Sequence, residues 1–178
     1  LIKKGANINI VGHKGNTPLH NAIRFSKNIA LVKLLVKHDA KVDVKNEEGN
    51  TPLYLAARNE VLAEILIKNG ADINAVNKYG DTPLHNAAKN FDATKLLLQY
   101  KPKINVVNNS GEAPIHIGAR NLETLQLLIE NGAKLDLKTR DLNSLIHIGA
   151  KNNAVLQFLV SKGLEINSKN KYGNTALH

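Results

Sequence analysis

The feature that most constrains this chain is a four-residue motif that recurs at nearly constant spacing along its length. The motif is Thr-Pro-Leu-His or a variant of it, and successive copies begin 34 residues apart once and then 31 residues apart four times. The six copies begin at Thr17, Thr51, Thr82, Ala113, Ser144 and Thr175. Self-similarity at such a period is typical of a repeat solenoid, in which each unit buries its apolar face by stacking on its neighbours.

Each unit is expected to hold two helices and an extended arm. Thr or Ser is a favourable helix N-cap, and Pro fits the first helical turn, so a short helix is predicted over residues 53–57. Apolar residues at helical spacing predict a second helix over 60–68. Gly70 can end this helix in the left-handed conformation. The alternation over 73–76 and the residues 77–80 indicate an arm and a tight turn.

This pattern resembles the ankyrin repeat, whose signature is Thr-Pro-Leu-His-x-Ala at a period of about 33 residues. The resemblance implies an all-α repeat solenoid of ankyrin-type helix-turn-helix units with β-hairpin-like arms, stacked in a curved array over residues 1–178. We expect five complete repeats, at 15–48, 49–79, 80–110, 111–141 and 142–172, with the end of a repeat at 1–14 and the start of another at 173–178. Since the chain begins at Leu1 and carries no polar capping repeat, it is expected to be an internal part of a longer array.

Several positions depart from the family pattern. Leu142 stands where the turn Gly belongs and Leu145 where Pro belongs, so we expect a distorted hairpin there. Lys101-Pro102 replaces Gly-Ala, which predicts an irregular helix end. The 31-residue units carry a cation followed by Asn after the first helix, and Asn tolerates a left-handed cap. In the longer first unit, Phe25 is expected to take the place of that Asn.

The motif histidines are the first candidates for metal or acid–base chemistry. Stacked helices lie about 8–10 Å apart, whereas zinc ligands lie about 2 Å from the ion, so histidines in successive units cannot converge on one ion. The resemblance implies instead that they make structural hydrogen bonds to the signature Thr and to neighbouring backbone. Cys is absent, and we find no phosphate-binding loop, nucleophile elbow or zinc-protease motif. We therefore expect no enzyme, no catalytic residue, no metal and no cofactor. The five histidines are His20, His85, His116, His147 and His178.

One cation per complete unit follows the first helix. The resemblance places this position on the concave face beside the arms, so the column predicts a basic ladder that binds an acidic partner surface. The alternative is that these cations only complement helix dipoles. The column comprises Arg24, Arg58, Lys89, Arg120 and Lys151.

The turn tips vary between units, and loops on a rigid frame often carry the binding residues. Lys78, Tyr79, Arg140 and Tyr172 are predicted partner contacts, with Tyr as a common interface anchor. Phe25 is a further predicted anchor. The alternative is that these aromatic residues are tolerated on the surface without binding anything.

The net charge of +9 says little about nucleic acid. The basic residues are 20 Lys and only 4 Arg beside 24 Asn, which indicates codon bias, and aromatic residues make up 4% of the chain. Proteins that recognise nucleic-acid bases favour Arg and aromatic side chains on which the bases stack. The segment 49–79 is neutral, and 111–141 carries four Lys and Arg against five Asp and Glu. A phosphate-binding track should be basic throughout, so nucleic-acid or acidic-surface binding through the ladder is kept only as an alternative.

These observations predict a non-catalytic protein–protein interaction module that binds through its concave face and hairpin tips. One alternative is a spacer or targeting arm of a large multidomain protein that resembles bacterial effectors and toxins. No run approaches the roughly 18 apolar residues of a membrane span, so no membrane insertion is expected. We expect no oligomer except through uncapped ends. The expected location is the cytoplasm, or a host cytoplasm if the protein is a secreted effector.

Overall fold

The structure, a computed structural model, describes residues 6–26 and 28–178. The prediction for the beginning of the partial repeat, residues 1–5, lies outside the described residues. The chain divides into two compact units, Leu1–Asn86 and Ala87–His178. The described residues form helices and turns without a β-strand, which confirms the predicted all-α class.

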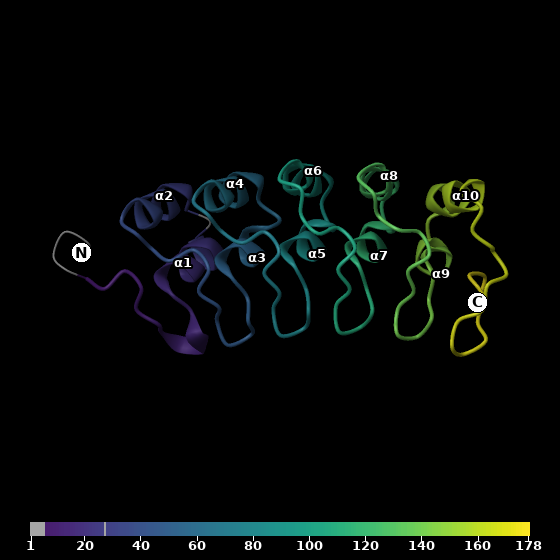
Figure 1. The fold of residues 1–178 in the computed structure, drawn as a ribbon, viewed down its shortest axis with the longest axis horizontal. Helices are drawn as coiled ribbons and strands as arrows, with labels where there is room; N and C mark the ends of the chain where they lie inside the picture. The colour runs from purple at the N-terminus through teal and green to yellow at the C-terminus, as the bar shows by residue number, and fades with distance from the viewer. Residues whose placement is uncertain (1–5, 27) are drawn as a thin grey trace. The chain divides into compact units, whose positions relative to one another are not determined.

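The helices come in pairs, a short inner helix followed by a nine-residue outer helix. In Figure 1 the outer helices of unit 2 form one row, the inner helices form a second, and the arms project beyond the inner row. Unit 1 holds α1 (Pro18–Asn21), α2 (Ile29–Lys37), α3 (Pro52–Ala56) and α4 (Glu60–Lys68), and the unit boundary falls within α5 (Pro83–Ala87). Unit 2 holds α6 (Phe91–Gln99), α7 (Pro114–Gly118), α8 (Leu122–Glu130), α9 (Leu145–Gly149) and α10 (Asn153–Ser161). A 3₁₀ turn, η2 (His13–Gly15), precedes α1, and a π-helix, η3 (Ala22–Ser26), follows it.

The inner helices begin as their sequence predicts. The hydroxyl oxygen of Thr51 accepts the backbone N–H of Tyr54 at 3.2 Å, and Pro52 fills the first helical position. The helix predicted over 53–57 is observed as α3, displaced by one residue, and the helix predicted over 60–68 is observed as α4.

The outer helices begin at an Asn whose role the sequence analysis assigned wrongly. The side-chain oxygen of Asn59 accepts the N–H of Leu62 at 3.1 Å, so Asn59 is the N-cap of α4. Its φ of −124° lies in the extended region, which excludes the expected left-handed cap. The same capping bond is made by Asn28, Asn90, Asn121 and Asn152.

The position of Phe25 also needs correction. Asn28 follows Thr17 by 11 positions, whereas Asn59 follows Thr51 by eight. The three additional residues of the first unit lengthen its inner helix into η3. Phe25 therefore does not replace the repeated Asn, because Asn28 occupies that place.

The arms are turns. In each unit a single backbone hydrogen bond joins a turn tip to the tip before it. In unit 1 the N–H of Asn77 donates to the carbonyl of Asp81 at 3.1 Å and closes the turn. The N–H of Lys78 then donates to the carbonyl of Glu48, one repeat earlier, at 3.0 Å. In unit 2 the N–H of Arg140 makes the equivalent bond to Ser110 at 2.9 Å. The hairpin-like form of the arms is thus present without paired strands.

The distortion expected at Leu142 is absent. Leu142 adopts a left-handed φ of 59°, and its turn keeps the usual bond, from the N–H of Thr139 to the carbonyl of Asn143, at 3.0 Å. Lys101 likewise takes the left-handed conformation of the Gly that it replaces, with φ 52°. Pro102 has no N–H and cannot make the bond of Ala71 to Leu66. The end of α6 therefore lacks one backbone hydrogen bond that the end of α4 has, as the predicted irregularity implied.

Candidate inner-helix binding surface

The predicted cation column is exposed in both units. In unit 2, Lys89, Arg120 and Lys151 follow three successive inner helices, and the outer helices α6, α8 and α10 pack in the same order. Within the residues that the structure describes, none of these cations forms an ion pair. Their charges are therefore available to a partner. In unit 1, Arg24 and Arg58 are also exposed and without an ion pair among the described residues.

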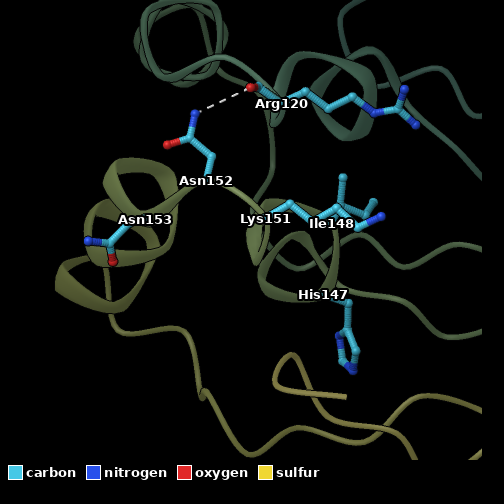
Figure 2. A pocket seen from close by; sticks show the side chains of 6 residues that line it. All are labelled: Arg120, His147, Ile148, Lys151, Asn152 and Asn153. Carbon is cyan, nitrogen blue, oxygen red and sulfur yellow. Dashed lines mark hydrogen bonds between the residues drawn. The ribbon is translucent and has the colours of Figure 1, made fainter.

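Two of these cations lie beside a hollow of about 800 Å³ in unit 2. Figure 2 shows the side chains of Arg120 and Lys151 extending in the same direction, and the half-buried Ile148 lines the same hollow. The side-chain nitrogen of Asn152 donates to the carbonyl of Arg120 at 3.5 Å, which links the two turns. The hollow thus combines two positive charges with one apolar side chain. Its lining residues are Arg120, His147, Ile148, Lys151, Asn152 and Asn153.

In unit 1 the corresponding surface carries an aromatic side chain. Phe25 is 74% exposed, and the guanidinium carbon of Arg24 lies 5.5 Å from the centre of its ring. This distance allows a cation–π interaction. Phe25 and Arg24 therefore present one joint apolar and positive surface on η3.

The two predicted tyrosine anchors differ in their surroundings. Tyr79 is 60% exposed and Tyr172 is 65% exposed. The Tyr172 hydroxyl donates to Oδ1 of Asp141 at 3.2 Å, and Nζ of Lys171 lies 3.6 Å from the same oxygen. Tyr172 is thus held against a neighbouring tip. Arg140 is exposed at a tip of the same unit, and Lys78 is exposed beside Tyr79 in unit 1.

Comparison with known families decides what kind of scaffold carries this surface. A family model described as ankyrin repeats (3 copies) matches residues 1–77 and 59–141. The chain belongs to the ankyrin-repeat family. Ankyrin repeats generally act as protein–protein interaction modules and are typically non-catalytic. A comparison with curated proteins finds no match. Among the described residues, no helix has the length and apolar character needed to cross a bilayer.

The signature histidines of this ankyrin-repeat chain are structural, as predicted. Nδ1 of His20 accepts the N–H of Thr17 at 3.2 Å and lies 2.8 Å from its hydroxyl oxygen. Because Nδ1 is an acceptor, Nε2 carries the proton and donates to the carbonyl of Asn50, in the next repeat, at 3.1 Å. Burial lowers the pKa of His20, and it also lowers the pKa of His116.

His147 lines the hollow but is also engaged. Its Nδ1 lies 2.9 Å from the hydroxyl of Ser144, and its Nε2 lies 3.0 Å from the carbonyl of Asn174. Both ring nitrogens thus have partners on the protein. The candidate surface therefore offers Arg120, Lys151 and Ile148, rather than an imidazole, to a ligand.

A second Asn column of the ankyrin repeats was missed by the sequence analysis. The side-chain oxygen of Asn77 accepts the N–H of Tyr79 at 2.9 Å and the N–H of Asp81 at 3.0 Å. Its side-chain nitrogen donates to Oδ1 of Asn50, in the preceding turn, at 2.9 Å. The signal in the sequence was the constant 31-residue spacing of Asn46, Asn77 and Asn108, which codon bias does not explain. At Asn77 this column holds the tip in shape and joins it to the preceding one.

Proposed function

We propose that this ankyrin-repeat chain is a non-catalytic module that binds a partner protein with an acidic surface. The supporting observation is the pair Arg120 and Lys151, exposed beside an 800 Å³ hollow and without an ion pair among the described residues. Charge complementarity at such a surface speeds association and selects among partners. The binding residues in unit 2 are Lys89, Arg120 and Lys151 with the tip residues Arg140 and Tyr172.

In unit 1 the proposed contacts are the cations and aromatic residues that lie at the end of the inner helices and at the turn tips. They are Arg24, Phe25, Arg58, Lys78 and Tyr79. The proposal includes no chemical step and no cofactor, since the family is typically non-catalytic. It places the protein in the cytoplasm, where ankyrin repeats are common.

A protein partner is favoured over nucleic acid by the charge distribution. Affinity for nucleic acid comes from many cations that contact successive phosphates. The segment 111–141, which contains Arg120, carries more Asp and Glu than Lys and Arg. The described positive surface is therefore local, and it suits a carboxylate group on a protein.

The test is a quantitative capture experiment from a nuclease-treated lysate with three forms of the chain. R120E/K151E reverses the charge beside the hollow. K95E/K134E is the matched control, because it changes the net charge equally at exposed sites of unit 2 away from the hollow. Proteins captured by the wild type and the control should be recovered about tenfold less well with R120E/K151E.

Equal capture by all three forms would reject the inner-helix surface. Capture of nothing by any form would favour the spacer alternative. Capture from a parallel untreated lysate that is absent from the nuclease-treated one would favour nucleic acid. Circular dichroism of each form serves as the folding control.

A further inference from the structure

A second hollow lies between the outer helices α2 and α4 of unit 1, away from the inner-helix surface. Its volume is about 410 Å³. Val36 and Ile65 are half-buried in it, whereas the lysines around it are exposed. It is lined by Lys33, Val36, Lys37, Ile65, Lys68 and Asn69. We call it the outer groove.

The outer groove carries positive charge that the described residues do not neutralise. Lys68 pairs with Glu64 at 2.6 Å, and the two side chains are 62% and 42% exposed. Lys33 and Lys37 form no ion pair within the described part of the chain. They lie four positions apart on α2, so they project from the same face of that helix.

Helix capping alone does not account for these lysines. Lys37 and Lys68 are the last residues of α2 and α4, where a cation complements the helix dipole. The last residues of α6, α8 and α10 are Gln99, Glu130 and Ser161, and these helices have the same length. A cation is thus not needed at this place. Lys33 lies in the middle of α2, where the dipole has little effect.

We propose that the outer groove binds an acidic amphipathic segment of a partner protein. The carboxylates of that segment lie over Lys33 and Lys37, and an apolar side chain packs on Val36 and Ile65. Charge complementarity selects this occupant, and helix-in-groove binding is a common way for a protein to receive such a segment. This inference goes beyond the function proposed above, because it uses a different surface and does not depend on Arg120 or Lys151.

Two other macromolecules fit the outer groove less well. A membrane surface is bound by apolar side chains that protrude between cations, whereas Val36 and Ile65 are half-buried and the lysines around them are exposed. A single-stranded nucleic acid is bound on aromatic side chains, and the groove lining has none. Both are outcomes that the experiment can return.

The experiment selects peptides from a displayed random library on the wild-type chain and measures their affinities by fluorescence anisotropy. K33E/K37E reverses the groove charge, and K33Q/K37Q removes it. K95E/K134E is the control for net charge, and R120E/K151E is the control for the inner-helix surface. We expect one class of peptides with Glu or Asp beside Leu or Ile at helical spacing. This class should bind K33E/K37E about tenfold more weakly, K33Q/K37Q at an intermediate level, and both controls normally.

A second readout locates the bound peptide. On titration with a selected peptide, the methyl NMR signals of Val36 and Ile65 should shift, and that of Ile148 should not. The inference is overturned if no selected peptide loses affinity for folded K33E/K37E, or if the shifts occur at Ile148. It is also overturned if phosphatidylserine vesicles or a single-stranded oligonucleotide bind the groove more tightly than the peptides. None of these outcomes depends on whether R120E/K151E loses its own partner.

Discussion

At the scale of single residues, backbone conformation explains positions where the repeat pattern breaks. Leu142 has a left-handed φ of 59° and is 49% exposed, so it adopts a turn conformation that suits Gly. An L-residue loses roughly 1–2 kcal/mol in this region. We expect Leu142→Gly to raise the free energy of unfolding by about 1 kcal/mol. Urea unfolding followed by circular dichroism measures the change.

Gly111 provides the opposite case at the same position of the preceding turn. It has φ 75°, and a Cβ there would lie 2.7 Å from the backbone nitrogen of Arg140. Because a backbone atom of the next tip cannot move aside as a side chain can, Gly111→Ala should lower the free energy of unfolding by about 2 kcal/mol or more. If Gly111→Ala and Leu142→Gly both left stability unchanged, the described turn geometry would be wrong.

The buried histidines make stability depend on pH. Burial lowers the pKa of His20 and His116 below the unfolded value of about 6.5. The unfolded state therefore takes up protons first as pH falls. The free energy of unfolding should be highest above about pH 7 and should fall through pH 6.5 toward the lowered pKa values. Urea unfolding at several pH values measures this slope, and H20Q/H116Q should reduce it. An unchanged slope in the double variant would assign the pH dependence to other groups.

At the scale of helices, capping decides where each element begins. Asn121 is the N-cap of α8, with its side-chain oxygen 2.8 Å from the nitrogen of Thr124. Asn121→Ala should lower the free energy of unfolding by about 1 kcal/mol, since one N–H of the first turn loses its acceptor. Asn153→Ala, at an exposed first position of α10, is the control and should have a much smaller effect. Equal effects of the two would mean that capping does not stabilise α8.

The sequence predicts an element well where the element follows from residue type and spacing, and poorly where it depends on backbone dihedral angles or side-chain packing. The helix over 60–68 was predicted with its observed bounds, because apolar spacing, an Asn-Gly end and repetition agree. The caps at Asn59 and its equivalents were missed because a side-chain hydrogen bond depends on local φ and ψ. The misplacement of Phe25 has a related cause, since the extra residues could be located only from the cap at Asn28. The cation column was predicted from spacing alone, whereas the hollow beside Arg120 and Lys151 depends on side-chain packing.

At the scale of the whole molecule, a net charge of +9 and a local positive surface make different predictions for binding kinetics. Charges steer association over about 10 Å at 0.1 M salt, and added salt shortens this range. We expect association of the partner recovered with the wild-type chain to slow by about tenfold as salt rises, with a smaller change in dissociation. Stopped-flow fluorescence at several salt concentrations measures both rates.

The variants separate the two sources of steering because R120E/K151E and K95E/K134E change the net charge by the same amount. If the charges beside the hollow guide the encounter, R120E/K151E removes most of the salt dependence and K95E/K134E keeps most of it. If both variants lose the same share of the salt dependence of association, the net charge of the whole molecule guides the encounter. The charges beside the hollow then have no special role. The first result is expected, because Arg120 and Lys151 have no ion partner among the described residues and their field is not cancelled nearby.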